Sequence, residues 1–337
     1  VGHRGIPDAS HDRVGTQTAG FAKERERMNA KTLCIRIAVS ATILMLLCRG
    51  LDRDGLLRLV READPGWMAL AAAWVAASMA ISTGKWSRLL LAQEIPVSWG
   101  TLWRSYWVGL FFNNFLPSSV GFDAIRILTL RDEGRTPGIL LSVVVERLLA
   151  LAGLALVGAI AVASGRAPAG LGALFAVGGG FAVALVALVL FPPALPSGRS
   201  GTRILAKIRA FLSETAGEGR RLRAHPRTLL SGILWGAAFQ LTVIAVNYSL
   251  LRAFGASIGL LEACAAIPAV SVAAMIPLSI NGFGFREGAT VSLLGFYGIA
   301  HETAFAVSLS FALLVAAESL YGGLLWIARS AGERSNA

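Results

Sequence analysis

Residues 277–289 read PLSINGFGFREGA and interrupt an apolar part of the chain with a proline, three glycines, an asparagine, an arginine and a glutamate. The whole chain of 337 residues is 55% hydrophobic and 15% charged, with a mean hydropathy of +0.64. This composition excludes an ordinary soluble domain and is typical of an integral membrane protein. The break at 277–289 therefore needs an explanation that holds inside a membrane.

Long apolar runs predict the number of membrane crossings. A hydrocarbon core about 30 Å thick needs roughly 20 mostly apolar residues in a helix. Six runs of about that length occur, at 33–50, 67–92, 138–163, 169–191, 228–251 and 303–328. Two weaker regions, 101–133 and 257–300, are interrupted by glycine and proline. The sequence predicts an all-α polytopic membrane protein with about six full transmembrane helices.

The net charge of +11 reflects Lys and Arg, which we expect in loops and at helix ends under the positive-inside rule rather than at a nucleic-acid interface. The most basic segment, 192–227, is predicted to be a cytoplasmic loop. Within it, a helix over 203–213 either lies on anionic headgroups or is a solvated surface helix. Lys31 and Arg36 before the first helix put the N-terminus in the cytoplasm. Counting crossings from there makes the chain cytoplasmic again near residue 95, flanked by Lys85, Arg88 and Arg104, and places the C-terminus in the cytoplasm too. The protein is expected in the inner (plasma) membrane.

The same count requires 101–133 and 257–300 each to enter and leave on one side, as two re-entrant helical hairpins. Their turning points read FLPSSVGFDAIR (115–126) and MIPLSINGFGFREG (275–288), and both contain Pro, a Ser two residues later, and then Gly-Phe and charges. The two units have opposite orientation, which indicates an inverted repeat whose broken helices meet near the bilayer midplane. A match this short also arises by chance, and that alternative stays open.

Composition also predicts how the chain divides. Residues 1–32 are polar and begin with Val, so we expect a disordered segment or a wrongly assigned start, with translation beginning at Met28. Residues 33–330 are predicted to form a single transmembrane domain, and 331–337 a short C-terminal tail.

A helix break at membrane depth is tolerated only where protein or a water-filled cavity satisfies the freed backbone groups. Asn281 can bond such groups, and Arg286 begins the next half-helix, where exposed N–H groups favour an anion. Glycine permits a tight turn and close approach. The predicted turn residues are Pro117 and Gly121 in the first hairpin, and Pro277, Gly282, Gly284 and Gly288 in the second.

These motifs resemble the lysylphosphatidylglycerol synthase transmembrane, or flippase-like, family. The family pattern runs Pro, Gly-Gly-Asp-x-x-Arg, then Glu-Arg in the next helix, and later Pro-x-Ser-x-Asn-Gly-x-Gly-x-Arg-Glu-Gly. The matching positions are Pro117, Gly121, Asp123, Arg126, Glu146, Arg147, Pro277, Ser279, Asn281, Gly282, Gly284, Arg286, Glu287 and Gly288. Phe122 stands where the family has Gly. The resemblance covers roughly 33–330 and implies a stand-alone lipid-translocating membrane domain without the aminoacyl-transferase domain.

Charged residues inside the membrane are the main candidates for function, because each costs about 2.5–3.5 kcal/mol at a helix centre unless it is paired or hydrated. A planar guanidinium suits lipid phosphate because it donates two parallel hydrogen bonds. The predicted lipid-binding residues are Arg126, Arg147, Asn281 and Arg286. Predicted charge partners, or carriers of a coupling proton, are Asp123, Glu146, Glu287 and Glu318. The alternative is that these charges form fixed salt bridges between helices.

We therefore predict translocation or binding of an anionic phospholipid or a polyprenyl-phosphate-linked lipid, rather than enzymatic activity. One alternative is an intramembrane lipid or glycosyl transferase. Another is a non-catalytic partner subunit of a separate glycosyltransferase or lipid synthase. The acidic residues stand beside arginines, which favours anion binding over a metal site, and we expect neither a metal nor a cofactor. The sequence carries no nucleotide-binding loop, so ATP-driven transport by this chain alone is not expected.

Overall fold

The computed structural model describes residues 42–43, 45–47, 52–115, 120–130, 135–168, 170–191, 203–275 and 282–335. Within these ranges the regular secondary structure is helical, from α2 to α12, as the sequence predicts. The predicted N-terminal segment 1–32 lies outside the described residues. So does most of the predicted first membrane helix, of which residues 42–43 and 45–47 are described as helical.

Long apolar helices match the remaining predicted runs. Five described helices are long and apolar enough to cross a membrane. They are α3 (Pro65–Leu91), α6 (Thr136–Ala163), α7 (Leu171–Leu190), α9 (Pro226–Ala253) and α12 (His301–Ser335). The chain is therefore a multi-pass membrane protein, and five of the six predicted membrane-spanning helices are present among the described residues.

Local sequence explains where these helices begin. The Asp64 carboxylate accepts a hydrogen bond of 2.7 Å from the Gly66 N–H, and so satisfies one of the N–H groups that the first turn of α3 leaves free. Pro65 follows at the first helical position, where its missing N–H costs nothing. Pro226 occupies the same position in α9.

Each of the two weaker regions forms a pair of short helices. The first pair is α4 (Trp99–Phe115) and α5 (Val120–Leu130), and the second is α10 (Leu260–Ala274) and α11 (Phe285–Phe296). These helices have 17, 11, 15 and 12 residues. At 1.5 Å per residue they extend about 17 to 26 Å, less than the roughly 30 Å of a hydrocarbon core. The two short helices of each pair pack against each other, where the sequence predicts the hairpins. The residues that connect them, 116–119 and 276–281, lie outside the described residues.

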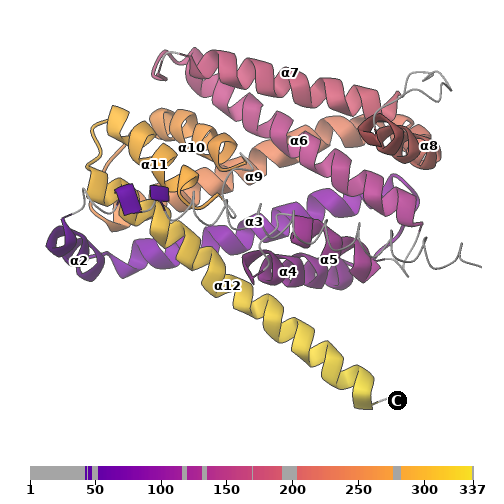
Figure 1. Ribbon diagram of the computed structural model, residues 1–337, viewed down its shortest axis with the longest axis horizontal. Helices are drawn as coiled ribbons and strands as arrows, with labels where there is room; N and C mark the ends of the chain where they lie inside the picture. The colour runs from indigo at the N-terminus through magenta and orange to yellow at the C-terminus, as the bar shows by residue number, and fades with distance from the viewer. Residues whose placement is uncertain are drawn as a thin grey trace, which may run out of the picture.

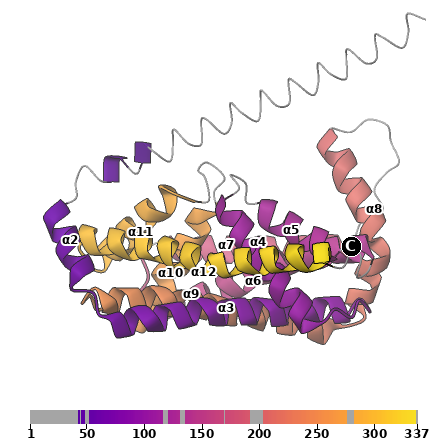
Figure 2. The same cartoon turned by 90° about the horizontal axis from the view of Figure 1, so that it is seen from below.

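The helices fall into two units, α3–α6 and α9–α12, each with a long helix, a hairpin and a second long helix. Helices α3 and α9 pack side by side (Figure 2), α6 packs against α10, and α12 packs against α4. The last helix of each unit therefore contacts the first short helix of the other. A two-fold relation requires this reciprocity, which supports the inverted repeat.

Glycines allow the long helices to cross closely. A Cβ atom on Gly236 of α9 would lie 2.6 Å from the Leu149 carbonyl oxygen of α6, and one on Gly153 would collide with the backbone of Ala237. At the other crossing, a Cβ on Gly322 of α12 would collide with the Trp107 carbonyl of α4. Close backbone approach of this kind is how membrane helices gain packing without a hydrophobic driving force.

Two further helices lie at the ends of the bundle, α2 (Arg53–Arg61) and α8 (Arg203–Arg223) (Figure 1). A helix over 203–213 is predicted and present. The C-terminal half of α8 packs against α6 and α7 and buries Leu222. Glu218 on this half accepts a hydrogen bond of 2.7 Å from Arg135 Nε at the start of α6. Helix α8 is therefore docked on the bundle rather than solvated on all sides.

Candidate functional site

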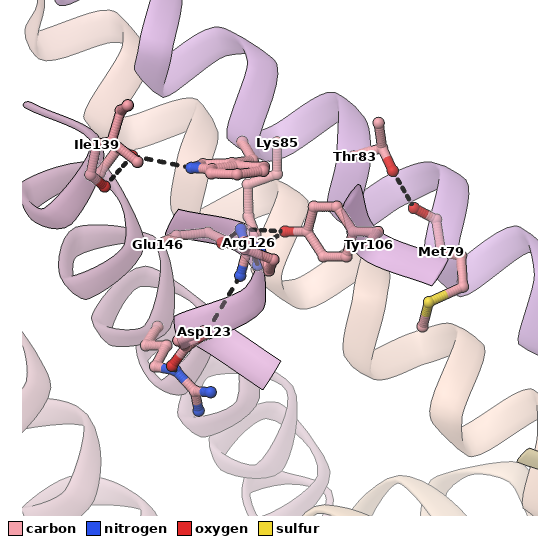
Figure 3. A network of polar contacts seen from close by, with 11 residues as sticks. Met79, Thr83, Lys85, Tyr106, Asp123, Arg126, Ile139 and Glu146 are labelled. Carbon is pink, nitrogen blue, oxygen red and sulfur yellow. Dashed lines mark hydrogen bonds and ion pairs between the residues drawn. The ribbon is translucent and has the colours of Figure 1, made fainter. Parts of the chain in front are cut away.

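A buried arginine lies at the centre of the first hairpin. Arg126 of α5 is 1% exposed. Its Nη2 atom donates hydrogen bonds to Glu146 Oε2 of α6 at 2.5 Å and to the Tyr106 hydroxyl of α4 at 2.9 Å. Figure 3 shows these side chains directed toward one another. Three helices therefore meet at one charged group.

Glu146 receives further partners on its other oxygen. The Tyr106 hydroxyl donates to Glu146 Oε1 at 2.6 Å, and Lys85 Nζ of α3 lies 3.3 Å from the same oxygen. All of these side chains are buried. A buried carboxylate is tolerated only with good geometry and enough hydrogen bonds, and Glu146 has both.

Aromatic rings surround the Arg126 guanidinium. Its Cζ atom lies 4.0 Å from the ring centroid of Trp86, 4.1 Å from that of Tyr106 and 5.2 Å from that of Phe122. Phe122 replaces the glycine of the family pattern, and it is accommodated because α4 carries Gly109 at this contact, where a Cβ would lie 3.1 Å from the Phe122 ring. Desolvated cation–π contacts contribute about 2 kcal/mol or more. Arg126 is therefore held rigidly.

The network reaches the surface through a second arginine. Arg147 Nε donates to Asp123 Oδ2 at 2.6 Å, and Asp123 Oδ1 lies 3.5 Å from Arg126 Nη1. The Arg147 side chain is 53% exposed, and within the described residues its two terminal nitrogens have no hydrogen-bond partner. Together with Lys85, the network holds three cations and, with Glu146, two carboxylates. By formal charge one positive charge is left over, and the exposed cation is Arg147.

The second hairpin carries a different cluster. Arg286 donates to Glu287 Oε1 at 2.7 Å through Nη2, and the Ser308 hydroxyl of α12 lies 3.3 Å from the same oxygen. Glu287 Oε2 accepts a hydrogen bond of 2.5 Å from the Gly284 N–H. The anion expected at the start of α11 is thus supplied by Glu287, which is 1% exposed. Arg286 and Glu287 neutralise each other.

Corresponding positions of the two hairpins carry opposite charges. When Gly121-Phe122 is placed on Gly282-Phe283, Arg126 coincides with Glu287. Each contacts the long helix that follows its hairpin, since Arg126 contacts Glu146 and Glu287 contacts Ser308. The repeat thus preserves the position of a buried polar group and changes its charge.

The predicted turn residues divide into three groups. Gly282 and Gly284 have φ angles of 80° and 89°, which favour glycine, and they form the turn before α11. Gly121 and Gly288 lie within the first turns of α5 and α11 and are not in the connecting loops. Pro117 and Pro277 lie outside the described residues, and so does Asn281, which is predicted to bind lipid.

Glu318 of α12 lies apart from these clusters. Its Oε1 atom is buried and has no hydrogen-bond partner among the described residues. No ion pair joins it to Arg126, Arg147 or Arg286 within the part of the chain that the structure describes. Its predicted role as a charge partner or proton carrier stays a prediction.

Sequence reasoning misplaced Lys85 and missed Tyr106 and Trp86. Lys85 is a buried partner of Glu146 and is not a flanking cytoplasmic charge, because α3 continues to Leu91. Trp86 is also buried and donates from Nε1 to Ser142 Oγ at 2.8 Å. One available signal was the position of Lys85 inside the apolar run 67–92, where an unpaired charge would be costly.

The chemistry of this network suits an anion. Arginine and lysine are hydrogen-bond donors without acceptor capacity at physiological pH. Within the described residues, no group of three or more His, Cys, Asp or Glu side chains is placed to hold a metal ion. The free donors on the exposed edge belong to Arg147.

Comparisons with known proteins agree with the motifs. The family pattern described as "Lysylphosphatidylglycerol synthase TM region" matches residues 33–320. The chain is also similar to the UPF0104 membrane protein PH1989 of Pyrococcus horikoshii, with 22% identity over 312 residues, covering 83% of this chain and 90% of that protein.

Proposed function

Because the chain belongs to the lysylphosphatidylglycerol synthase transmembrane family, and so has a function related to membrane lipids, we propose that it binds an anionic lipid at Arg147 and moves it across the bilayer. The observation that carries this proposal is the exposed Arg147 guanidinium, whose terminal nitrogens have no hydrogen-bond partner within the described residues. Arg147 is the exposed member of a network with three cations and two carboxylates.

The geometry explains how phosphate would bind without leaving another charge unpaired. A guanidinium donates two parallel hydrogen bonds to phosphate, and Arg147 uses only Nε for Asp123. Its terminal nitrogens face a phosphate, while Asp123 stays paired to Arg126 at 3.5 Å. Arg126 itself is too buried to meet a lipid directly and acts as a positioning residue.

The two hairpins supply a means of moving the lipid headgroup. Short helices that end inside a membrane leave polar backbone groups there, and these groups line a polar path. In this proposal Asn281 and Arg286 contact the phosphate from the second hairpin, with Glu287 releasing Arg286 as the lipid arrives. The protein acts in the inner membrane with both termini in the cytoplasm.

Replacing Arg147 with Gln tests the binding site. We expect at least about tenfold slower transbilayer movement of fluorescent phosphatidylglycerol and polyprenyl-phosphate probes in proteoliposomes, because a charged hydrogen bond to phosphate is lost. Arg147→Lys keeps the charge without the bidentate geometry, so its rate of probe movement should lie between those of wild type and Arg147→Gln. Arg166→Gln removes an exposed arginine outside the network and should match wild type. Unchanged movement with Arg147→Gln would remove Arg147 from the lipid site.

Arg286→Gln tests the contribution of the second hairpin. Glu287 is 1% exposed and loses its partner Arg286, so some stability is lost, although Glu287 keeps its bonds to the Gly284 N–H and to Ser308. The variant is therefore compared with wild type at equal amounts of folded protein. We expect slower probe movement while lipid binding in detergent, which depends on Arg147, persists. Normal movement at a normal expression level would assign Arg286 a purely structural role.

The same vesicles separate the other predicted functions. If the purified wild-type chain moves no probe, a non-catalytic subunit that works with a glycosyltransferase or lipid synthase becomes the better proposal. The network would then serve assembly, and its variants would lower complex formation and not lipid movement.

A further inference from the structure

An apolar groove runs along α6 beside Arg147. It has a volume of about 480 Å³ and lies between α6, α7 and α10. Its walls include Leu151, Leu154 and Ala155 of α6, Phe175 and Gly178 of α7, and Val272 of α10. The volume falls within the range of about 300–1,000 Å³ that is usual for ligand pockets. Polar atoms contribute almost nothing to its lining.

The groove has a buried floor and an open rim. Leu154 and Phe175 are 4% and 2% exposed, whereas Val177 and Met275 on the rim are 72% and 60% exposed. Phe175 belongs to the hydrophobic core between the two units, together with Ala269 of α10. An elongated apolar molecule can therefore enter from the membrane side and pack against the buried side chains of Leu154 and Phe175.

The groove and the cation share one face of α6. Leu151 follows Arg147 by four residues, and Leu154 follows it by seven, so all three lie on the same side of the helix. At 1.5 Å per residue, the groove begins about 6 Å along the helix from Arg147 and continues for about another 6 Å. A site for a headgroup and a site for an apolar chain therefore follow one another along α6, in the same order as the phosphate and the acyl chain of a lipid.

Resting on the function proposed above, we propose that this groove binds one acyl chain of an anionic diacyl glycerophospholipid whose phosphate contacts Arg147. The surplus positive charge selects an anionic headgroup. The glycerol of such a lipid separates the phosphate from the first methylenes, which matches the gap of about 6 Å between Arg147 and Leu151. In a polyprenyl phosphate the chain starts at the phosphate itself, so it would place apolar carbon against the charged network.

Gly178 offers a way to fill the groove without disturbing its walls. A Cβ added at Gly178 meets nothing within 4 Å, and the same holds for Gly180 on the same helix, which does not line the groove. Gly178→Phe and Gly180→Phe are therefore matched variants. Both remove a helical glycine and add the same ring, but only the first blocks the groove.

The test is a titration of wild type and both variants, in phosphatidylcholine nanodiscs, with dioleoyl-phosphatidylglycerol, with its deacylated headgroup glycerophosphoglycerol, and with undecaprenyl phosphate. We expect Gly178→Phe to bind the dioleoyl lipid at least about tenfold more weakly than wild type and than Gly180→Phe do. All three proteins should bind glycerophosphoglycerol equally, because it has no acyl chain to enter the groove. If Gly178→Phe binds the dioleoyl lipid normally while Arg147→Gln does not, the groove is no chain site.

Other outcomes also decide the matter. Equal loss of binding to dioleoyl-phosphatidylglycerol and to glycerophosphoglycerol would place the effect on the headgroup site or the fold and overturn the inference. If Gly178→Phe weakens the binding of undecaprenyl phosphate alone, the groove binds a polyprenyl chain instead of an acyl chain. If wild type binds none of the lipids, the function proposed above fails, and the acyl-chain site fails with it.

Discussion

Glu146→Gln is expected to lower the free energy of unfolding by about 3–5 kcal/mol, the usual cost of removing one partner from a buried ion pair. Arg126 Nη2 and Lys85 Nζ lie 2.5 and 3.3 Å from the Glu146 oxygens. Both cations are buried, so water cannot replace the lost carboxylate. Titration of the purified protein with sodium dodecyl sulfate, followed by circular dichroism, measures the change.

A second substitution separates charge imbalance from lost packing. Adding Lys85→Met to Glu146→Gln removes one unpaired cation, and we expect about half of the lost stability to return, since residues in one network couple strongly. Glu214→Gln, an exposed position on α8, should leave stability unchanged. If Glu146→Gln unfolds at the wild-type midpoint, or if adding Lys85→Met restores no stability, the network does not stabilise the packing of these helices.

Gly322→Ala is expected to destabilise the protein by about 3 kcal/mol, at the upper end of overpacking effects. Its Cβ would collide with the Trp107 carbonyl of α4. A carbonyl cannot rotate away as a side chain can, so α12 must move from α4 and open the contact between the two units. The improved helix propensity of alanine, about 1 kcal/mol, offsets only part of this cost.

Gly180→Ala is the matched control for Gly322→Ala, because a Cβ at Gly180 meets nothing within 4 Å. It gains propensity without a clash and should unfold at the wild-type midpoint or slightly above it. Thermal unfolding in detergent, read out by size-exclusion chromatography of the surviving protein, compares the two. Equal stability of both variants would contradict the close α4–α12 crossing.

Much of the fold was predictable from the sequence, because each signal is local. An apolar run of 20 residues or more makes a helix that crosses a membrane wherever its neighbours lie. The runs at 67–92, 138–163 and 228–251 correspond closely to α3, α6 and α9. The glycines of the opening stretch likewise predict a turn, and Gly282 and Gly284 adopt the positive φ angles that only glycine takes readily.

The candidate site was only partly predictable. Asp123, Arg126, Glu146 and Arg147 were identified because charges within apolar sequence are costly and need partners. Lys85 was read as a flanking charge, since nothing in the local sequence distinguishes a lysine near a helix end from one packed on a carboxylate. Trp86, which is 0% exposed, was missed because nothing in the local sequence shows that its ring packs on Arg126 of another helix.

The sequence by itself thus determined that this is an all-helical membrane protein with two broken hairpins and several intramembrane charges, because hydrophobic length and backbone freedom are properties of short segments. The tertiary structure alone decided how those charges pair. Glu146 meets groups that lie 20 and 40 residues away on α5 and α4, whereas Arg286 meets its own neighbour Glu287. Pairing depends on which helices pack together, and that packing leaves Arg147 exposed beside an apolar groove.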